Sequence, residues 1–183
     1  MLQFFRLAGR LKETSRAGWL LQGIRDPESV ADHTFRVCLL ALVLAKDVDG
    51  PIDVERCLTM ALIHDLAESI VGDITPHDGI PVEEKNRREG GAMKRLSDLI
   101  DNGEILSIWE EYQAGATPEA RFVKELDKLE TVLQAAEYEE AHQLDLQEFW
   151  EMGERSLVSS ISKEILDVLS QRREFNHERG DIR

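Results

Sequence analysis

The chain has 183 residues, of which 36 are acidic and 22 basic, and its formal net charge at pH 7 is −14. This excess of negative charge argues against binding along a nucleic-acid polymer, which relies on a net basic face. A small phosphate ester stays compatible with it, provided that a divalent ion and a few basic side chains offset the negative field locally.

The length fits a single domain covering residues 1–183. No stretch approaches the roughly 20 apolar residues of a membrane-spanning helix, and the first residues lack the apolar segment of a secretion signal. Cys38 and Cys57 lie in apolar helical stretches, which is typical of small core residues rather than of a disulfide framework. We therefore expect a cytoplasmic protein without a membrane partner.

Apolar residues recur every three to four positions along most of the chain, which predicts an all-α fold. Asp26 as a cap and Pro27 in the first turn predict the start of a helix or of the segment that leads into it, and Thr117 with Pro118 predict another helix start. A loop rich in glycine and proline should cover residues 72–81. The expected helices cover about residues 2–12, 27–44, 53–70, 83–100, 104–113, 118–141 and 146–170, followed by a polar tail over 172–183 that frays.

The pair His64-Asp65 stands in an otherwise apolar run within the expected third helix. A neutral imidazole and a carboxylate are ligands that suit a catalytic divalent ion. His33 shares a helical face with apolar residues of its own helix, and Asp127 lies beside an apolar row in the long helix. Each of these residues alone is more simply a buried hydrogen-bonding group. Burying all of them would cost roughly 1 to 3 kcal/mol per unsatisfied group, so the set together predicts a metal ion inside a helical bundle.

The order of His, His-Asp and Asp, each on its own helix, resembles the HD-domain metal-dependent phosphohydrolases. Further motifs point to the branch of 5'-deoxynucleotidases, and the likeness covers about residues 10–150: Arg16-Ala17-Gly18-Trp19, Glu28-Ser29-Val30-Ala31-Asp32-His33, Gly72-Asp73-Ile74-Thr75-Pro76 and Phe122-Val123-Lys124-Glu125-Leu126-Asp127-Lys128. The resemblance implies an HD-domain helical bundle with a buried metal site. It also implies hydrolysis of deoxyribonucleoside 5'-monophosphates to deoxynucleoside and phosphate, and a homodimer. The apolar parts of the first and last helices could form the interface of such a dimer.

The resemblance further implies roles for matching positions. One divalent ion, manganese, cobalt or magnesium, would be held by His33, His64, Asp65 and Asp127. Glu68 would act on the attacking water as general base or orienting group, and Asp73 would assist or protonate the leaving 5'-oxygen. An alternative is a second ion held by Glu68, Asp73 and the carbonyl of Ile74.

Arg16 would pair with the substrate phosphate through its planar guanidinium, and Trp19 would pack on the sugar or base. A solvated arginine and a core tryptophan are the alternatives. Lys85, Arg87 and Arg88 could add positive potential near the phosphate, but a solvated helical face is the favoured interpretation. His77 could reach the site on a mobile loop, although a surface position is favoured, and His142 and His177 are assigned no role.

Two other functions stay open at this point. One is an HD phosphohydrolase that acts on a cyclic nucleotide, a nucleoside triphosphate or a guanosine alarmone. The other is a helical module without catalytic activity, in which the ion is purely structural.

Overall fold

The structure is a computed structural model that describes residues 1–48 and 50–179. Within these ranges every regular element is a helix, and the one extended pairing is an isolated bridge between Ser15 and Ser29. The α-helices are α1 (Leu2–Ala8), α2 (Ala17–Leu21), α3 (Val30–Leu44), α4 (Val54–Ile63), α5 (Glu68–Val71), α6 (Val82–Asp98), α7 (Gly103–Ala114), α8 (Pro118–His142), α9 (Gln147–Ser156) and α10 (Ser160–Arg179). The short 3-10 helices are η1 (Gly9–Lys12), η2 (Ala45–Asp47) and η3 (Pro76–Asp78). The prediction of an all-α fold is therefore confirmed.

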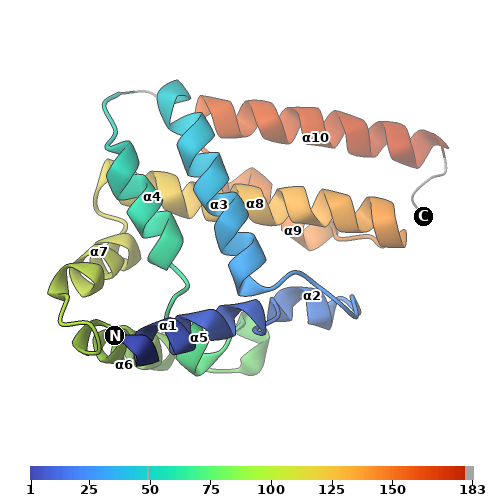
Figure 1. The fold of residues 1–183 in the computed structure, drawn as a ribbon. Coiled ribbons are helices and arrows are strands. Elements are labelled where there is room, and N and C mark those ends of the chain that lie inside the picture. The colour runs from blue at the N-terminus through green and yellow to red at the C-terminus, as the bar shows by residue number, and fades with distance from the viewer. Residues whose placement is uncertain (49, 180–183) are drawn as a thin grey trace.

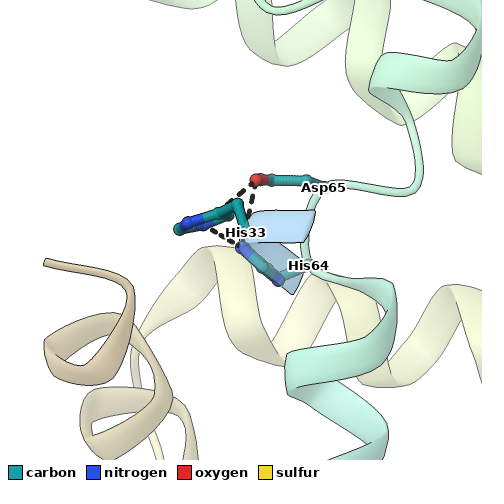
Figure 2. A group of neighbouring side chains, drawn as sticks. All are labelled: His33, His64 and Asp65. Carbon is teal, nitrogen blue, oxygen red and sulfur yellow. Dashed lines mark hydrogen bonds and ion pairs between the residues drawn. The ribbon is translucent and has the colours of Figure 1, made fainter. Parts of the chain in front are cut away.

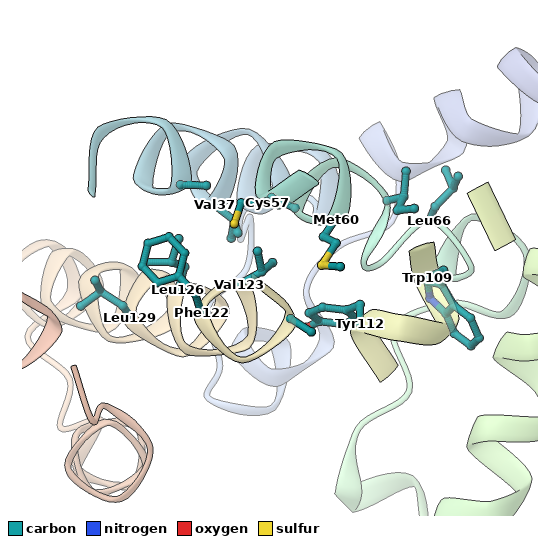
Figure 3. Packing of buried hydrophobic residues seen from close by; sticks show 14 of the residues in the cluster. Val37, Cys57, Met60, Leu66, Trp109, Tyr112, Phe122, Val123, Leu126 and Leu129 are labelled. Atoms are coloured by element: carbon teal, nitrogen blue, oxygen red, sulfur yellow. The ribbon is translucent and has the colours of Figure 1, made fainter. Parts of the chain in front are cut away.

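Helix α8 is the central element, and α3, α4, α7, α9 and α10 all pack against it (Figure 1). The core lies between α8 on one side and α3, α4 and α7 on the other (Figure 3). Its most deeply buried members include Val37, Cys57, Met60, Val123, Leu126 and Leu129. Polar residues in register with these apolar rows are therefore carried into the interior.

The caps of α3 and α8 show how the sequence starts these helices. Thr117 accepts a hydrogen bond from the amide of Ala120, so the predicted cap of α8 is confirmed. The cap of α3 is Ser29, which exchanges hydrogen bonds with Asp32 in a capping box. Because the capping box starts the helix at Val30, Asp26 and Pro27 belong to the segment that leads into it, and Asp26 as the cap of the helix itself is wrong.

The expected third helix over residues 53–70 is wrong in its second half. Helix α4 ends at Ile63, a tight turn covers residues 64–67, and α5 begins at Glu68. The indole Nε1 of Trp109, on α7, donates a hydrogen bond of 3.1 Å to the carbonyl of His64. In a continuous α-helix this carbonyl would accept a hydrogen bond from the backbone amide four residues later. The turn instead continues with backbone hydrogen bonds between residues three apart.

The expected last helix over 146–170 is in fact two helices, α9 and α10. The buried carboxylate of Glu125 on α8 accepts hydrogen bonds of 2.7 Å from the amides of Val158 and Ser159, which holds the connection between them. Ser159 then accepts from the amide of Ser162 at the start of α10. The expected fraying tail is helical to Arg179, and residues 180–183 lie outside the described residues.

The cysteines and the apolar character of the helices were also subjects of the sequence analysis. Cys38 and Cys57 are both free thiols, as predicted. None of the helices in the described part of the chain is both long enough and apolar enough to cross a bilayer.

Candidate metal centre

Three elements bring four predicted ligands together. His33 comes from α3, His64 and Asp65 from the turn after α4, and Asp127 from α8. The Nε2 atoms of His33 and His64 lie 3.3 Å apart, and Asp65 Oδ2 lies 3.0 Å from His64 Nε2 and 3.7 Å from His33 Nε2 (Figure 2). Asp127 Oδ1 lies 3.3 Å from His33 Nε2.

The two imidazoles are oriented by their other nitrogens. His33 Nδ1 contacts the carboxylate of Glu130, and His64 Nδ1 lies 2.7 Å from the carbonyl oxygen of Ala61. Because both acceptors favour a proton on Nδ1, both Nε2 atoms present lone pairs to one shared centre. Ligating atoms of His33, His64 and Asp65 lie within 4.8 Å of one another. This arrangement fits a divalent cation with mixed nitrogen and oxygen ligands.

The electrostatics of the centre favour positive charge. Burial and the charge of Arg16 lower the pKa of His33, but Asp127 and Glu130 outweigh them and raise it to about 9, so a proton competes with a cation for Nε2 at neutral pH. Burial raises the pKa of Asp65, but the imidazoles of His64 and His33 outweigh this and hold it below its usual range. Burial also opposes a low pKa for Asp127, which its neighbours Lys128 and His33 nevertheless depress. The site therefore keeps its carboxylates ionised, as cation ligands must be.

Glu68 and Asp73 lie beside this centre, and their environments differ. Glu68 is 6% exposed, and burial followed by the charges of Asp65 and Asp73 raises its pKa well above the ordinary value. Asp65 Oδ2 and Glu68 Oε2 are buried atoms that accept no hydrogen bond within the described chain. Asp73 accepts a hydrogen bond of 2.7 Å from the amide of Ala17 at the start of α2. Unsatisfied buried oxygens of this kind are what a cation or a bound water would satisfy.

Two cavities flank the cluster. A larger one of about 430 Å³ extends from Asp65 and Asp127 towards α2 and α9. A smaller one of about 240 Å³ opens between α6, α7 and α8. Five side chains line both cavities: Asp65, Glu68, Lys85, Asp127 and Lys128. The candidate ligands Asp65 and Asp127 therefore lie between the two cavities.

Arg16 and Trp19 both line the larger cavity, but only Arg16 faces the cluster. Its NH1 lies 3.8 Å from Asp65 Oδ2, and its NH2 donates a hydrogen bond of 3.2 Å to the hydroxyl of Thr131. Trp19 is 1% exposed, and its Nε1 donates a hydrogen bond of 2.9 Å to Glu28. Trp19 thus has little surface to offer a ligand directly.

The basic side chains divide between surface and site. Arg87 and Arg88 pair with Glu84 on the exposed face of α6, as expected. Lys85, by contrast, lines both cavities and donates a hydrogen bond of 2.8 Å to the carbonyl of Ile74. The favoured interpretation of Lys85 as part of a solvated face is therefore wrong, and the alternative position near the site holds, because Lys85 lies one helical turn before the buried Glu89, its partner at 3.6 Å.

Two further described histidines, His77 and His142, lie outside the centre, and the surface position favoured for His77 is confirmed. His77 is exposed in η3, although it lines the larger cavity, and His142 is exposed at the end of α8. The side chain of His177 lies outside the described residues.

Sequence reasoning missed three residues of the centre: Glu130, Arg36 and Lys128. Glu130 is fully buried and joins His33 to Arg36, whose Nε donates to it at 2.8 Å. Lys128 pairs with Asp127 at 2.9 Å. Glu130 lies three residues after Asp127 on the same helical face, and this spacing was the available signal.

Comparison with known proteins gives matches along most of the chain. The family profile described as HD domain matches residues 8–166. The zebrafish protein named 5'-deoxynucleotidase HDDC2 is 50% identical over 143 residues, which cover 76% of this chain and 70% of that protein. The fission yeast protein named 5'-deoxynucleotidase hdd1 is 40% identical over 184 aligned positions, covering 96% of this chain and 91% of the relative.

Solved structures agree with the sequence relatives. The PH0347 protein from Pyrococcus horikoshii superposes with a TM-score of 0.79 at 38% identity, covering 93% of this chain and 97% of that one. A predicted metal-dependent phosphohydrolase from Magnetospirillum magnetotacticum gives a TM-score of 0.74 at 27% identity, covering 99% and 93%. Since the family profile matches well over half of the chain, and relatives of 40 to 50% identity cover most of it, the protein belongs to the HD-domain family.

Proposed function

We propose that this protein is a metal-dependent phosphomonoesterase that hydrolyses deoxyribonucleoside 5'-monophosphates to deoxynucleoside and inorganic phosphate. The observation that carries the proposal is the convergence of two imidazole Nε2 atoms and carboxylate oxygens on one centre beside a cavity of about 430 Å³. The 5'-deoxynucleotidase names of relatives from zebrafish and fission yeast support the same substrate class.

We assign the ion to a four-residue set comprising His33, His64, Asp65 and Asp127. A divalent ion bound there, manganese, cobalt or magnesium, supplies Lewis-acid polarisation of the phosphoryl group and lowers the pKa of a water molecule. The ligand set has no thiolate, which is compatible with each of these ions.

The remaining side chains supply binding and proton transfer. Arg16 pairs with the phosphate through its guanidinium, supported from behind by Thr131. Glu68 takes a proton from the attacking water, and burial together with the charges of Asp65 and Asp73 raises its pKa, which makes its carboxylate a stronger base. As the bond between phosphorus and the 5'-oxygen breaks, the proton that Glu68 took from the water passes to that oxygen, and Asp73 assists this transfer.

We favour one ion over two. A second ion held by Glu68, Asp73 and the carbonyl of Ile74 would compete with Lys85, whose ammonium already occupies that carbonyl at 2.8 Å. Metal analysis of the purified protein distinguishes the two cases, since one ion per chain is expected.

The function is tested by measuring phosphate release from deoxyadenosine 5'-monophosphate together with bound metal. Asp65→Asn removes one ligand charge while keeping the size of the side chain, so we expect both metal content and turnover to fall. Retained turnover with lost metal would exclude a metal-dependent reaction at this centre.

For the partner of the chain we propose a second copy. The apolar parts of the first and last helices are one candidate interface for this homodimer, and α3 offers a further exposed row: Phe35 (65% exposed), Leu39 (43%), Leu42 (56%) and Val43 (55%). Asp32 and Lys46 lie equally far along the chain from Leu39, on opposite sides of it. An antiparallel pairing of two α3 helices about Leu39 would therefore place Asp32 of each copy near Lys46 of the other.

The dimer is tested by light scattering on Phe35→Glu. This change buries a charge in the paired row, so we expect the dimer to become monomeric. A matched change on the exposed surface of α10, Val168→Glu, should leave a dimer paired through α3 intact. Dissociation by the α10 change alone would favour the terminal helices.

We also propose that residues 1–183 form one domain, which is supported by the packing of α9 and α10 on α8. Limited proteolysis should leave these helices together with the rest of the chain. The proposed compartment is the cytoplasm, which fractionation of cells carrying the tagged protein tests.

A further inference from the structure

The larger cavity has two chemically different ends. One end is the metal cluster with Arg16, Asp65 and Asp127, and the other is formed by residues of α9. A nucleotide with its phosphate at the cluster must place its nucleoside away from those charges. The cavity volume of about 430 Å³ falls in the range of small-molecule sites, whereas the cavity of about 240 Å³ on the other side falls below it and is lined mostly by polar and charged groups.

Helix α9 is held so that one face points into the larger cavity. Its opposite face is buried and includes Trp150, 3% exposed, and Gly153. A Cβ added at Gly153 would lie 2.6 Å from Val132 Cγ2, so α9 approaches α8 too closely for any larger residue. The face that remains carries Phe149 and Met152, both of which line the cavity and are half-buried.

Phe149 supplies the accessible aromatic surface at this end. Its ring packs on Trp19 with centroids 4.4 Å apart and an interplanar angle of 34°. Trp19 is 1% exposed, so a ligand in the cavity meets Phe149 rather than the indole. Tyr138 supports Trp19 from another side, with centroids 5.2 Å apart, and does not line this cavity.

A hydrogen bond between two side chains that line the same cavity lies beside Phe149. The side-chain amide of Gln22, just after α2, donates a hydrogen bond to the carboxylate of Glu148 on α9. The bond leaves the amide oxygen and one carboxylate oxygen for other partners. A flat apolar surface bordered by a few acceptors is suited to a heteroaromatic ring that carries donors on its edge.

We propose that Phe149 and Met152 form the nucleobase subsite, in which the base packs on the Phe149 ring, with Gln22 and Glu148 at its edge. This inference rests on the proposed function for the identity of the substrate. It assigns base binding to α9, outside the elements that carry the metal ligands, and it makes Trp19 a support for Phe149 rather than a direct contact.

The test compares two substrates that share the 5'-phosphate and the sugar: deoxyadenosine 5'-monophosphate and 2-deoxyribose 5-phosphate. In Phe149→Ala we expect the KM for the nucleotide to rise about tenfold, as for the loss of one base–aromatic stack, while the KM for the sugar phosphate stays unchanged. Phe149→Tyr keeps the ring and should restore the KM for the nucleotide.

Tyr138→Ala is the matched control, because it removes the other aromatic ring that packs on Trp19. We expect it to leave the ratio of the two KM values unchanged. Equal changes for both substrates in Phe149→Ala, or the same change in ratio in the control, would overturn the proposal. If Phe149→Ala does not fold, Phe149→Leu preserves apolar packing and is read in the same way.

Binding measurements separate this proposal from the proposed function. Calorimetry with the wild-type protein compares the dissociation constants of the two compounds. If neither is hydrolysed but the nucleotide binds more tightly, and Phe149→Leu removes that preference, the function fails while the base subsite stands. Equal binding of both compounds overturns the subsite.

Discussion

Substitution of Glu130 tests most directly what orients the imidazole of His33 in the metal centre. It is fully buried, and its two carboxylate oxygens contact His33 Nδ1 and Arg36 Nε. Glu130→Gln keeps the size of the side chain, but its amide can serve only one of these two donors as an acceptor. The change therefore either releases His33 from its orientation or leaves the Nε of Arg36 facing another donor.

The expected size of the effect is set by these contacts. Loss of a carboxylate behind a metal-binding histidine weakens metal binding by about 10- to 100-fold. One buried donor left unpaired also lowers the free energy of unfolding by about 1–3 kcal/mol. Calorimetric titration of chelator-treated protein with manganese measures the change in metal affinity. Urea unfolding measures the change in the free energy of unfolding.

Glu137→Gln is the control for this experiment. Glu137 also pairs with Arg36, at 2.8 Å, but its side chain is 57% exposed and does not contact His33. We expect near-normal metal affinity in this variant. Unchanged manganese affinity in Glu130→Gln, or an equal loss in both variants, would refute the orienting role of Glu130.

Three further predictions concern the reaction, the packing and the ion. Glu68→Gln should retain metal and lose about 10²- to 10⁴-fold in turnover, measured by phosphate release, as expected for loss of a general base, whereas loss of metal would make Glu68 a ligand. Gly153→Ala should lower the free energy of unfolding by about 1–3 kcal/mol in urea, because the new Cβ meets Val132 at 2.6 Å, and an unchanged midpoint would contradict that packing. Adding manganese at 100 times its dissociation constant should stabilise chelated protein by about 2.7 kcal/mol in thermal unfolding, and no shift would argue against a preformed site.

Helical periodicity is enough to predict the features that depend on local register. The spacing of apolar residues around His33 and Asp127 predicts core-facing positions for both, and both are buried. The cap at Thr117 is equally visible in the sequence, because it depends only on neighbouring residues. Local signals of this kind need no knowledge of distant contacts.

Other features depend on partners far along the chain. The turn after Ile63, which carries His64 and Asp65, is accompanied by a hydrogen bond from Trp109, 45 residues away from His64. The break between α9 and α10 is held by Glu125, more than 30 residues before it. Periodicity alone predicts a continuous helix in both places, so these corrections required the tertiary structure.

The most direct test of the central claim is phosphate release from a panel of nucleoside monophosphates, ribo and deoxy, 5' and 3'. The protein is first treated with chelator, and manganese, cobalt or magnesium is then added back. We expect release from deoxyribonucleoside 5'-monophosphates alone, lost with the chelator and restored by metal. No release from any of these compounds, with metal firmly bound, would contradict the assignment and favour a different phosphohydrolase or a structural ion.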